Sequence, residues 1–261
     1  MTQQNQIEVK RFDSREDYDA FTALNYSGSK SLLISPQHYL WAMGNKKDSP
    51  AMKLGRAIHG KILEPEVYSS TFAIVPKVDK RTKEGKETWA KLEAELVGKE
   101  LLSDQEAEVV NLTCTKVLQI MEKNEIQFEE TEVRYAVPYQ GIWLKASFDA
   151  VGSDGYIYDI KTTDDASQDG FLRSVRTFKY NLQAFFYQVV FFMVHGINAK
   201  GFRFIVVEKE SPGVAIYELG DLAMEFAQMD FVQAVEQYKE ANETGKWKNF
   251  DDKPMVVDFK G

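Results

Sequence analysis

The stretch at residues 142–163 reads IWLKASFDAVGSDGYIYDIKTT, and its side chains alternate in character with the period of two that marks β-strands. Between the runs 142–151 and 156–161, the sequence Gly152-Ser153-Asp154-Gly155 is typical of a tight turn. We therefore predict two antiparallel strands. Asp149 lies on the more polar face of the first strand, and Asp159 and Lys161 share a face of the second. The turn is expected to bring the two aspartates side by side.

The flanking residues extend this pair into an α/β fold. Strand-like runs are predicted at Glu132–Val137, Phe202–Val207 and Val214–Tyr217, and helices from Ser35-Pro36, at Met52–Glu64, across most of 89–123, at Tyr180–His195 and at Leu222–Asn242. Residues 76–87 are lysine-rich and are expected to form a mobile surface loop. The pattern predicts a central mixed β-sheet flanked by helices. We expect a polar lead at residues 1–28 and a single domain at 29–261.

Composition restricts the class of protein. The 261 residues carry a formal net charge of −8, which argues against coating nucleic acid by bulk charge but not against a local basic path. The single cysteine, Cys114, excludes an internal disulfide and a cysteine-rich metal centre, and the cytosol is the expected compartment. The most apolar stretch, Ala184–Val194, is too short to span a bilayer, so no membrane role is expected.

The two aspartates predict a metal site. Adjacent carboxylates repel each other, and burial disfavours their charged forms unless a cation compensates. A hard divalent ion with oxygen ligands is the natural partner, so Mg²⁺ is expected, with Mn²⁺ as an alternative. Lys161 would place a positive charge beside this ion, where it can steady charge that develops on a phosphate. An isolated Asp-x-Lys also occurs by chance on exposed strands, so its order relative to other residues matters.

Two further elements occur in the appropriate order. His59, in Gly55-Arg56-Ala57-Ile58-His59, can add a nitrogen ligand to a metal, although a lone histidine is more often structural. Gln183 and Tyr187 are four residues apart and so lie on one helical face, where they can hydrogen-bond a phosphate or the lysine. Without the other residues, they would simply decorate an apolar helix.

In this order, G-x3-H, a strand ending in Asp, D-I-K-T and Q-x3-Y resemble the RecB-type branch of the PD-(D/E)XK nuclease superfamily. More narrowly, residues 31–39 (SLLISPQHY), 54–65 (LGRAIHGKILEP) and 158–163 (YDIKTT) resemble the RecE, or exodeoxyribonuclease VIII, nuclease domain. The resemblance spans about Ser29 to Val207. It implies a PD-(D/E)XK restriction-endonuclease-like core, in which the metal ligands are His59, Asp149, Asp159 and the main-chain carbonyl of Ile160. It further implies that Lys161 is the catalytic lysine and that Gln183 and Tyr187 support it.

The resemblance also implies an activity and partners. We expect a Mg²⁺-dependent exonuclease that digests linear double-stranded DNA from its ends, 5′-to-3′ and without ATP. It would release 5′-phosphate products and leave 3′ single-stranded tails for a RecT-like annealing protein. A homo-oligomeric ring around DNA, and an origin in a phage or prophage, are also typical of this family. Two alternatives stay open: a structure-specific or restriction-like endonuclease of the same superfamily, and a non-catalytic DNA-binding module.

Basic residues near these motifs are candidates for phosphate contacts. They flank His59, occupy the loop after it and lead into the Gln183 helix: Lys53, Arg56, Lys61, Lys80, Arg81, Lys83, Arg173, Arg176 and Lys179. If the fold gathers them, they form a basic path with little sequence preference. The alternative is that these side chains are ordinary solvent-exposed charges that do not contact DNA.

Overall fold

The computed structural model describes residues 8–45, 49–76, 78–79, 81–211, 213–250 and 254. Its strands are β1 (Lys10–Phe12), β2 (Phe72–Val75), β3 (Glu100–Ser103), β4 (Phe128–Tyr139), β5 (Ile142–Gly152), β6 (Tyr156–Thr163), β7 (Gly201–Glu208) and β8 (Val214–Glu218). Its helices are α1 (Arg15–Ala20), α2 (Tyr26–Leu32), α3 (Pro36–Gly44), α4 (Pro50–Leu63), α5 (Pro65–Thr71), α6 (Lys83–Glu95), α7 (Asp104–Lys123), α8 (Gln168–Phe178), α9 (Tyr180–His195) and α10 (Asp221–Thr244).

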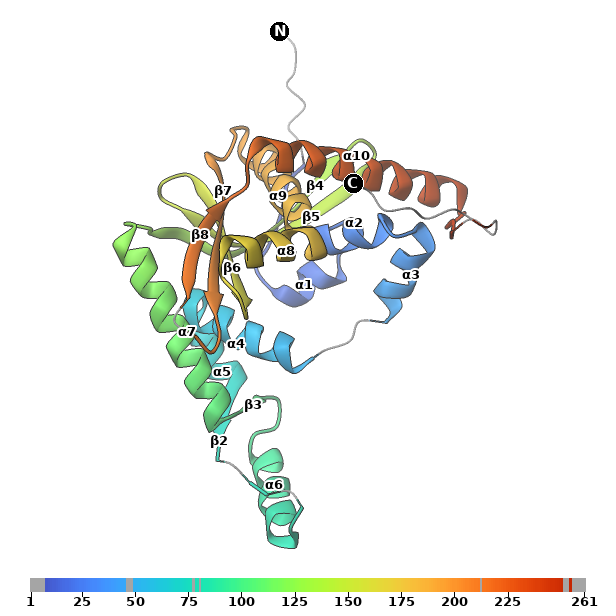
Figure 1. The fold of residues 1–261 in the computed structure, drawn as a ribbon. Coiled ribbons are helices and arrows are strands. Elements are labelled where there is room, and N and C mark those ends of the chain that lie inside the picture. The colour runs from blue at the N-terminus through green and yellow to red at the C-terminus, as the bar shows by residue number, and fades with distance from the viewer. Residues whose placement is uncertain are drawn as a thin grey trace.

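A six-stranded mixed sheet forms the centre of the molecule, in the order β1-β4-β5-β6-β7-β8 (Figure 1). Strands β6 and β7 run parallel, whereas every other neighbouring pair in this sheet is antiparallel. The predicted antiparallel meander of β4, β5 and β6 is therefore confirmed, as is the fold class. A parallel neighbour for β6 requires a crossover connection, which α8 and α9 supply.

Helices cover both faces of the sheet. On one face, α9 packs against β4, β5 and β7, and α10 packs on α9, so that Phe148, Phe186 and Phe231 share one core. On the other face, α4 and α7 approach the sheet, and Leu63 and Val117 pack with Tyr158 and Ile205. Among the described residues, no helix is long and apolar enough to cross a membrane.

Part of the predicted polar lead is joined to the central sheet. Strand β1 pairs with β4, and Leu24 bridges to Leu144 on the edge of β5. Buried Lys145 donates to the carbonyl oxygens of Tyr18 and Phe21, at 2.6 and 2.7 Å, and so caps the end of α1. These contacts join residues 10–24 to the sheet, whereas residues 1–7 lie outside the described part.

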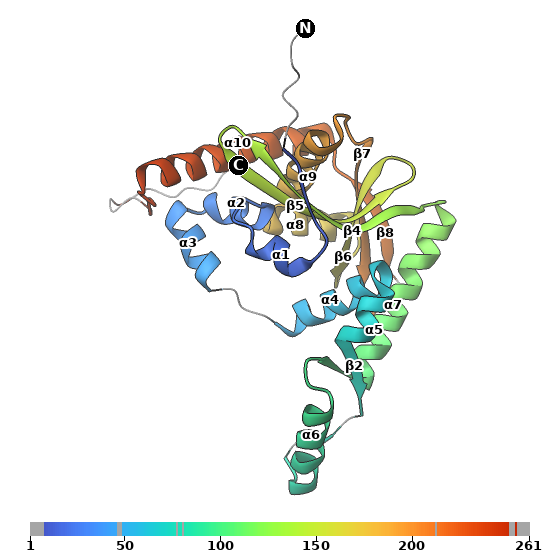
Figure 2. The same cartoon turned by 180° about the vertical axis from the view of Figure 1, so that it is seen from behind.

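An arm was missed by the sequence analysis. The parallel pair β2 and β3 carries α6 away from the main body, as both views show (Figure 2). The predicted mobile loop at 76–87 is wrong for its second half, because α6 begins at Lys83 and the Thr82 side chain caps it by accepting the amide of Gly85. The high density of charge in this segment resembled a loop, but lysine and glutamate are also good helix formers.

Candidate active site and metal centre

The site lies where β5 and β6 diverge. Their ladder consists of two pairs, Ala150 with Tyr158 and Val151 with Ile157. Beyond these two pairs, the amide of Ile160 in β6 donates to the side chain of Asp149 instead of a main-chain carbonyl of β5. The distance to Oδ2 of Asp149 is 2.9 Å. The divergence thus turns Asp149 toward β6 while keeping it hydrogen-bonded, as a partly buried carboxylate requires.

Helix α4 brings His59 to the same point. Ala57 and Ile58 are fully buried under the arm, which fixes the rotation of the helix and leaves His59 half-buried at the sheet. The Nε2 atom of His59 lies 2.8 Å from the carbonyl oxygen of Ile160, and its Nδ1 atom lies 3.3 Å from Oδ2 of Asp149. Three of the four predicted ligands therefore converge.

Asp159, the fourth, is 2% exposed and lies between Lys161 and Gln183. The ammonium of Lys161 is 2.6 Å from its Oδ2, and the Gln183 amide donates to its Oδ1 at 2.6 Å. Burial raises the pKa of Asp159 to about 6, against the opposing effect of Lys161. Tyr187, one helical turn from Gln183, packs edge-on against Phe148, so Gln183 supports the aspartate and Tyr187 packs in the core behind it.

Glu132 is a member of the cluster that the sequence analysis did not name. One carboxylate oxygen of Glu132 lies within 4.8 Å of ligand atoms of His59 and Asp149. Its backbone has a φ of 49°, a left-handed break in β4, and Arg134 is 2.8 Å from its carboxylate. Burial, and next the charge of Asp149, raise the pKa of Glu132 to about 7. Register counting across the Gln140-Gly141 turn would have placed it opposite Asp149.

These donors fit a divalent cation. Ligands about 2.1 Å from an octahedral Mg²⁺ lie about 3 Å from each other, close to the 2.8 Å between His59 Nε2 and the Ile160 oxygen. Burial is the main cause of the raised pKa values of Glu132 and Asp159, although each carboxylate already has one basic partner, and a cation would further favour their charged forms. The residues that would hold the ion are His59, Glu132, Asp149, Asp159 and the carbonyl of Ile160.

The predicted DNA-contacting residues do not form one basic path. Near His59, Lys53 pairs with Glu106, Arg56 pairs with Glu100, and Lys61 bonds Asn111, so these three residues brace α4 against β3 and α7. Lys83 begins α6, which lies away from α8 in both views (Figures 1 and 2). Arg81, two residues earlier, pairs with Asp79, and Lys80 lies outside the described residues.

The α8 group stays near the site. Beside Lys161, a pocket of about 450 Å³ opens past the end of β6, and its lining includes Thr163, Arg173, Thr177, Tyr180 and Lys209. Arg173 is paired with Asp165, and Lys179 with Asp230, whereas Arg176 is exposed in the last turn of α8. Of the predicted basic residues, only Arg173 lines this pocket.

The comparisons with known proteins agree with this architecture. Residues 25–250 match the family model described as a PDDEXK-like domain of unknown function (DUF3799). The fold is similar to a crystal structure described as a "Putative exonuclease" from Eubacterium rectale, with a TM-score of 0.61 at 13% sequence identity. That similarity covers 100% of this chain and 96% of the other. No curated protein matches the sequence.

Proposed function

Because the chain belongs to the PDDEXK-like family of unknown function (DUF3799), we propose that it is a metal-dependent deoxyribonuclease. The observation that carries the proposal is the convergence of His59, Glu132, Asp149 and the Ile160 carbonyl at the point where β5 and β6 diverge, with the Asp159–Lys161 pair on the same strand as Ile160. This donor set suits Mg²⁺, or Mn²⁺ in its place.

The side chains divide the chemical work. When bound, the metal acts as a Lewis acid and lowers the pKa of water. Asp159 holds the ammonium of Lys161 at 2.6 Å, where Lys161 offsets negative charge that develops on the phosphate during hydrolysis. Gln183 donates to Asp159 and so fixes its orientation, and Tyr187 packs against Phe148 one helical turn further along α9. The main chain of Ile160 orients both Asp149 and His59.

We further propose that the enzyme is an exonuclease of linear double-stranded DNA. The motifs shared with the RecE nuclease domain support 5′-to-3′ digestion without ATP, with 5′-phosphate products and 3′ single-stranded tails. The same resemblance supports a RecT-like annealing partner and a homo-oligomeric ring. The description of the structural neighbour as an exonuclease favours this mode over an endonuclease with the same site.

Digestion of end-labelled DNA tests the proposal. Linear duplex labelled at either the 5′ or the 3′ end, and covalently closed circles, are incubated with Mg²⁺, with Mn²⁺ or with a chelator. We expect metal-dependent loss of linear duplex, early release of the 5′ label and intact circles. Cleavage of circles would identify an endonuclease. DNA that is bound but never cut with either metal would identify a non-catalytic binding module.

A further inference from the structure

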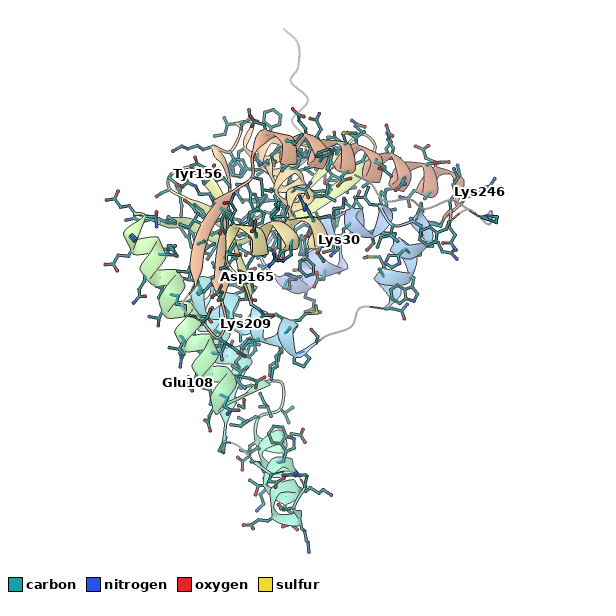
Figure 3. All side chains as sticks on the ribbon, in the orientation of Figure 1. Lys30, Glu108, Tyr156, Asp165, Lys209 and Lys246 are labelled. Carbon is teal, nitrogen blue, oxygen red and sulfur yellow. The ribbon has the colours of Figure 1, made fainter. Side chains whose placement is uncertain are left out.

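Lys30 belongs to α2, an element that supplies none of the metal-centre residues. It lies one turn after Tyr26, and its ammonium is 5.9 Å from the centre of the Tyr26 ring. The Tyr26 hydroxyl in turn donates to the carbonyl oxygen of Phe178, the last residue of α8. Figure 3 shows Lys30 at this junction of α2 with the end of α8. The position of Lys30 is thus tied to the segment that leads from α8 into α9.

The charge of Lys30 is not compensated within the described part of the chain. The described residues contain no carboxylate in ion-pair contact with it, whereas Lys161 has Asp159 at 2.6 Å. Burial, and then repulsion by Lys161, lower the pKa of Lys30. The Lys161 ammonium lies 4.8 Å from the centre of the Tyr180 ring, and this ring stacks on that of Phe178, whose carbonyl oxygen accepts the Tyr26 hydroxyl. Lys30 thus carries a half-buried charge with no ion-pair partner among the described side chains, and a bound anion would compensate it.

The nearby pocket suggests which anion. The pocket begins at Lys161 and extends toward Arg173 and Lys209, and none of its lining residues belongs to α2. Phe178, whose carbonyl oxygen accepts the Tyr26 hydroxyl, also lines the pocket, so Lys30 lies near the pocket wall that the end of α8 forms. A polyanionic strand that presents one phosphate to the metal and Lys161 can place a neighbouring phosphate at this wall. A lysine binds phosphate as a point charge and reads no sequence.

We propose that Lys30 binds a phosphate that flanks the scissile phosphate on the strand being cut, and so positions that strand. The proposal rests on the proposed nuclease function. When the first internucleotide linkage is cut, the flanking phosphate is either the 5′-terminal phosphate or the phosphate of the second internucleotide linkage. Both present the same chemistry to Lys30, and the substrates below distinguish them.

The test compares Lys30→Met with Lys200→Met under single-turnover conditions with Mg²⁺. Lys200 is a matched control because its ammonium also lies over a tyrosine, Tyr156, at the opposite end of β6. On ordinary duplex, we expect Lys30→Met to raise the half-saturating DNA concentration about 10-fold, the effect of one lost charge-assisted contact, with little change in the maximal rate. Lys30→Gln should behave alike, Lys30→Arg should restore binding, and Lys200→Met should match the wild type.

Modified duplexes then identify the phosphate. One substrate has a 5′-hydroxyl end and another a neutral methylphosphonate at the second linkage. On the substrate that lacks the phosphate bound by Lys30, wild type and Lys30→Met should have the same half-saturating DNA concentration, because the contact is absent in both. The proposal is overturned if Lys30→Met and Lys30→Gln bind ordinary DNA like Lys200→Met, or if their loss of affinity persists on both modified substrates. A wild-type protein that cuts no DNA would instead refute the proposed function.

Discussion

Neutralising Glu132 is expected to stabilise the metal-free protein while damaging its metal site. The pKa of Glu132 rises from 4.5 to about 7 in the folded protein. At about 1.36 kcal/mol per pKa unit, the ionised side chain is about 3 kcal/mol less favourable in the fold than in water. Between pH 4.5 and 7, the folded state binds more protons than the unfolded state, so this group makes stability fall as pH rises through that window. Above pH 7 the loss is complete.

Urea unfolding of Glu132→Gln and wild type in a chelator measures this effect. At pH 8, the variant should be roughly 2–3 kcal/mol more stable, whereas at pH 5 the difference should shrink to about 1 kcal/mol or less. Glu129→Gln, an exposed site on the same strand, should change little at either pH. Added Mg²⁺ should stabilise the wild type at pH 8 more than Glu132→Gln, because only the wild type keeps the full donor set. The reasoning would be refuted if Glu132→Gln were no more stable than wild type at pH 8, or if its gain in stability were the same at pH 5 and pH 8.

Three other variants probe separate contacts. Lys161→Ala should lower the cleavage rate by about 10²-fold or more, yet still bind duplex in Ca²⁺; unchanged digestion would remove Lys161 from the site. Gln183→Leu, which frees Asp159 to reorient, should raise the Mg²⁺ concentration for half-maximal activity roughly 10- to 100-fold, and an unaltered metal titration would contradict that role. Lys145→Met should lower the free energy of unfolding by about 2 kcal/mol because buried carbonyl oxygens at the end of α1 lose their donor; urea melts compare it with Lys200→Met, which should be neutral.

Local patterns were sufficient for the centre of the sheet. Alternation and the Gly152–Gly155 turn predicted β5 and β6 close to their observed bounds, and helix α9 begins and ends at the predicted residues. The shared face of Asp159 and Lys161 also follows from a period of two, and their atoms are 2.6 Å apart. Such features depend on neighbours in sequence, which is why they can be read before any tertiary contact is known.

Interactions between distant segments were harder to predict. Lys53, Arg56 and Lys61 flank His59 in sequence, but helical rotation turns them toward carboxylate or amide groups of β3 and α7. The arm combines β2 and β3, which are separated by α6 and pair in parallel, so neither strand has a local partner that would reveal it. Nothing in the sequence around Lys30 indicates its burial or the effect of Lys161 on its pKa, because both depend on residues far away in the chain.

The sequence by itself determined the meander, its turns and the order of the residues that meet at its open end, because side-chain alternation and turn chemistry act over a few residues. Only the tertiary structure decided that β5 and β6 separate after two pairs and that Asp149 takes the freed amide of Ile160. Those outcomes depend on how helices α4 and α9 pack against the two faces of the sheet. That packing is set by burial summed over residues far apart in the chain, which no local pattern contains.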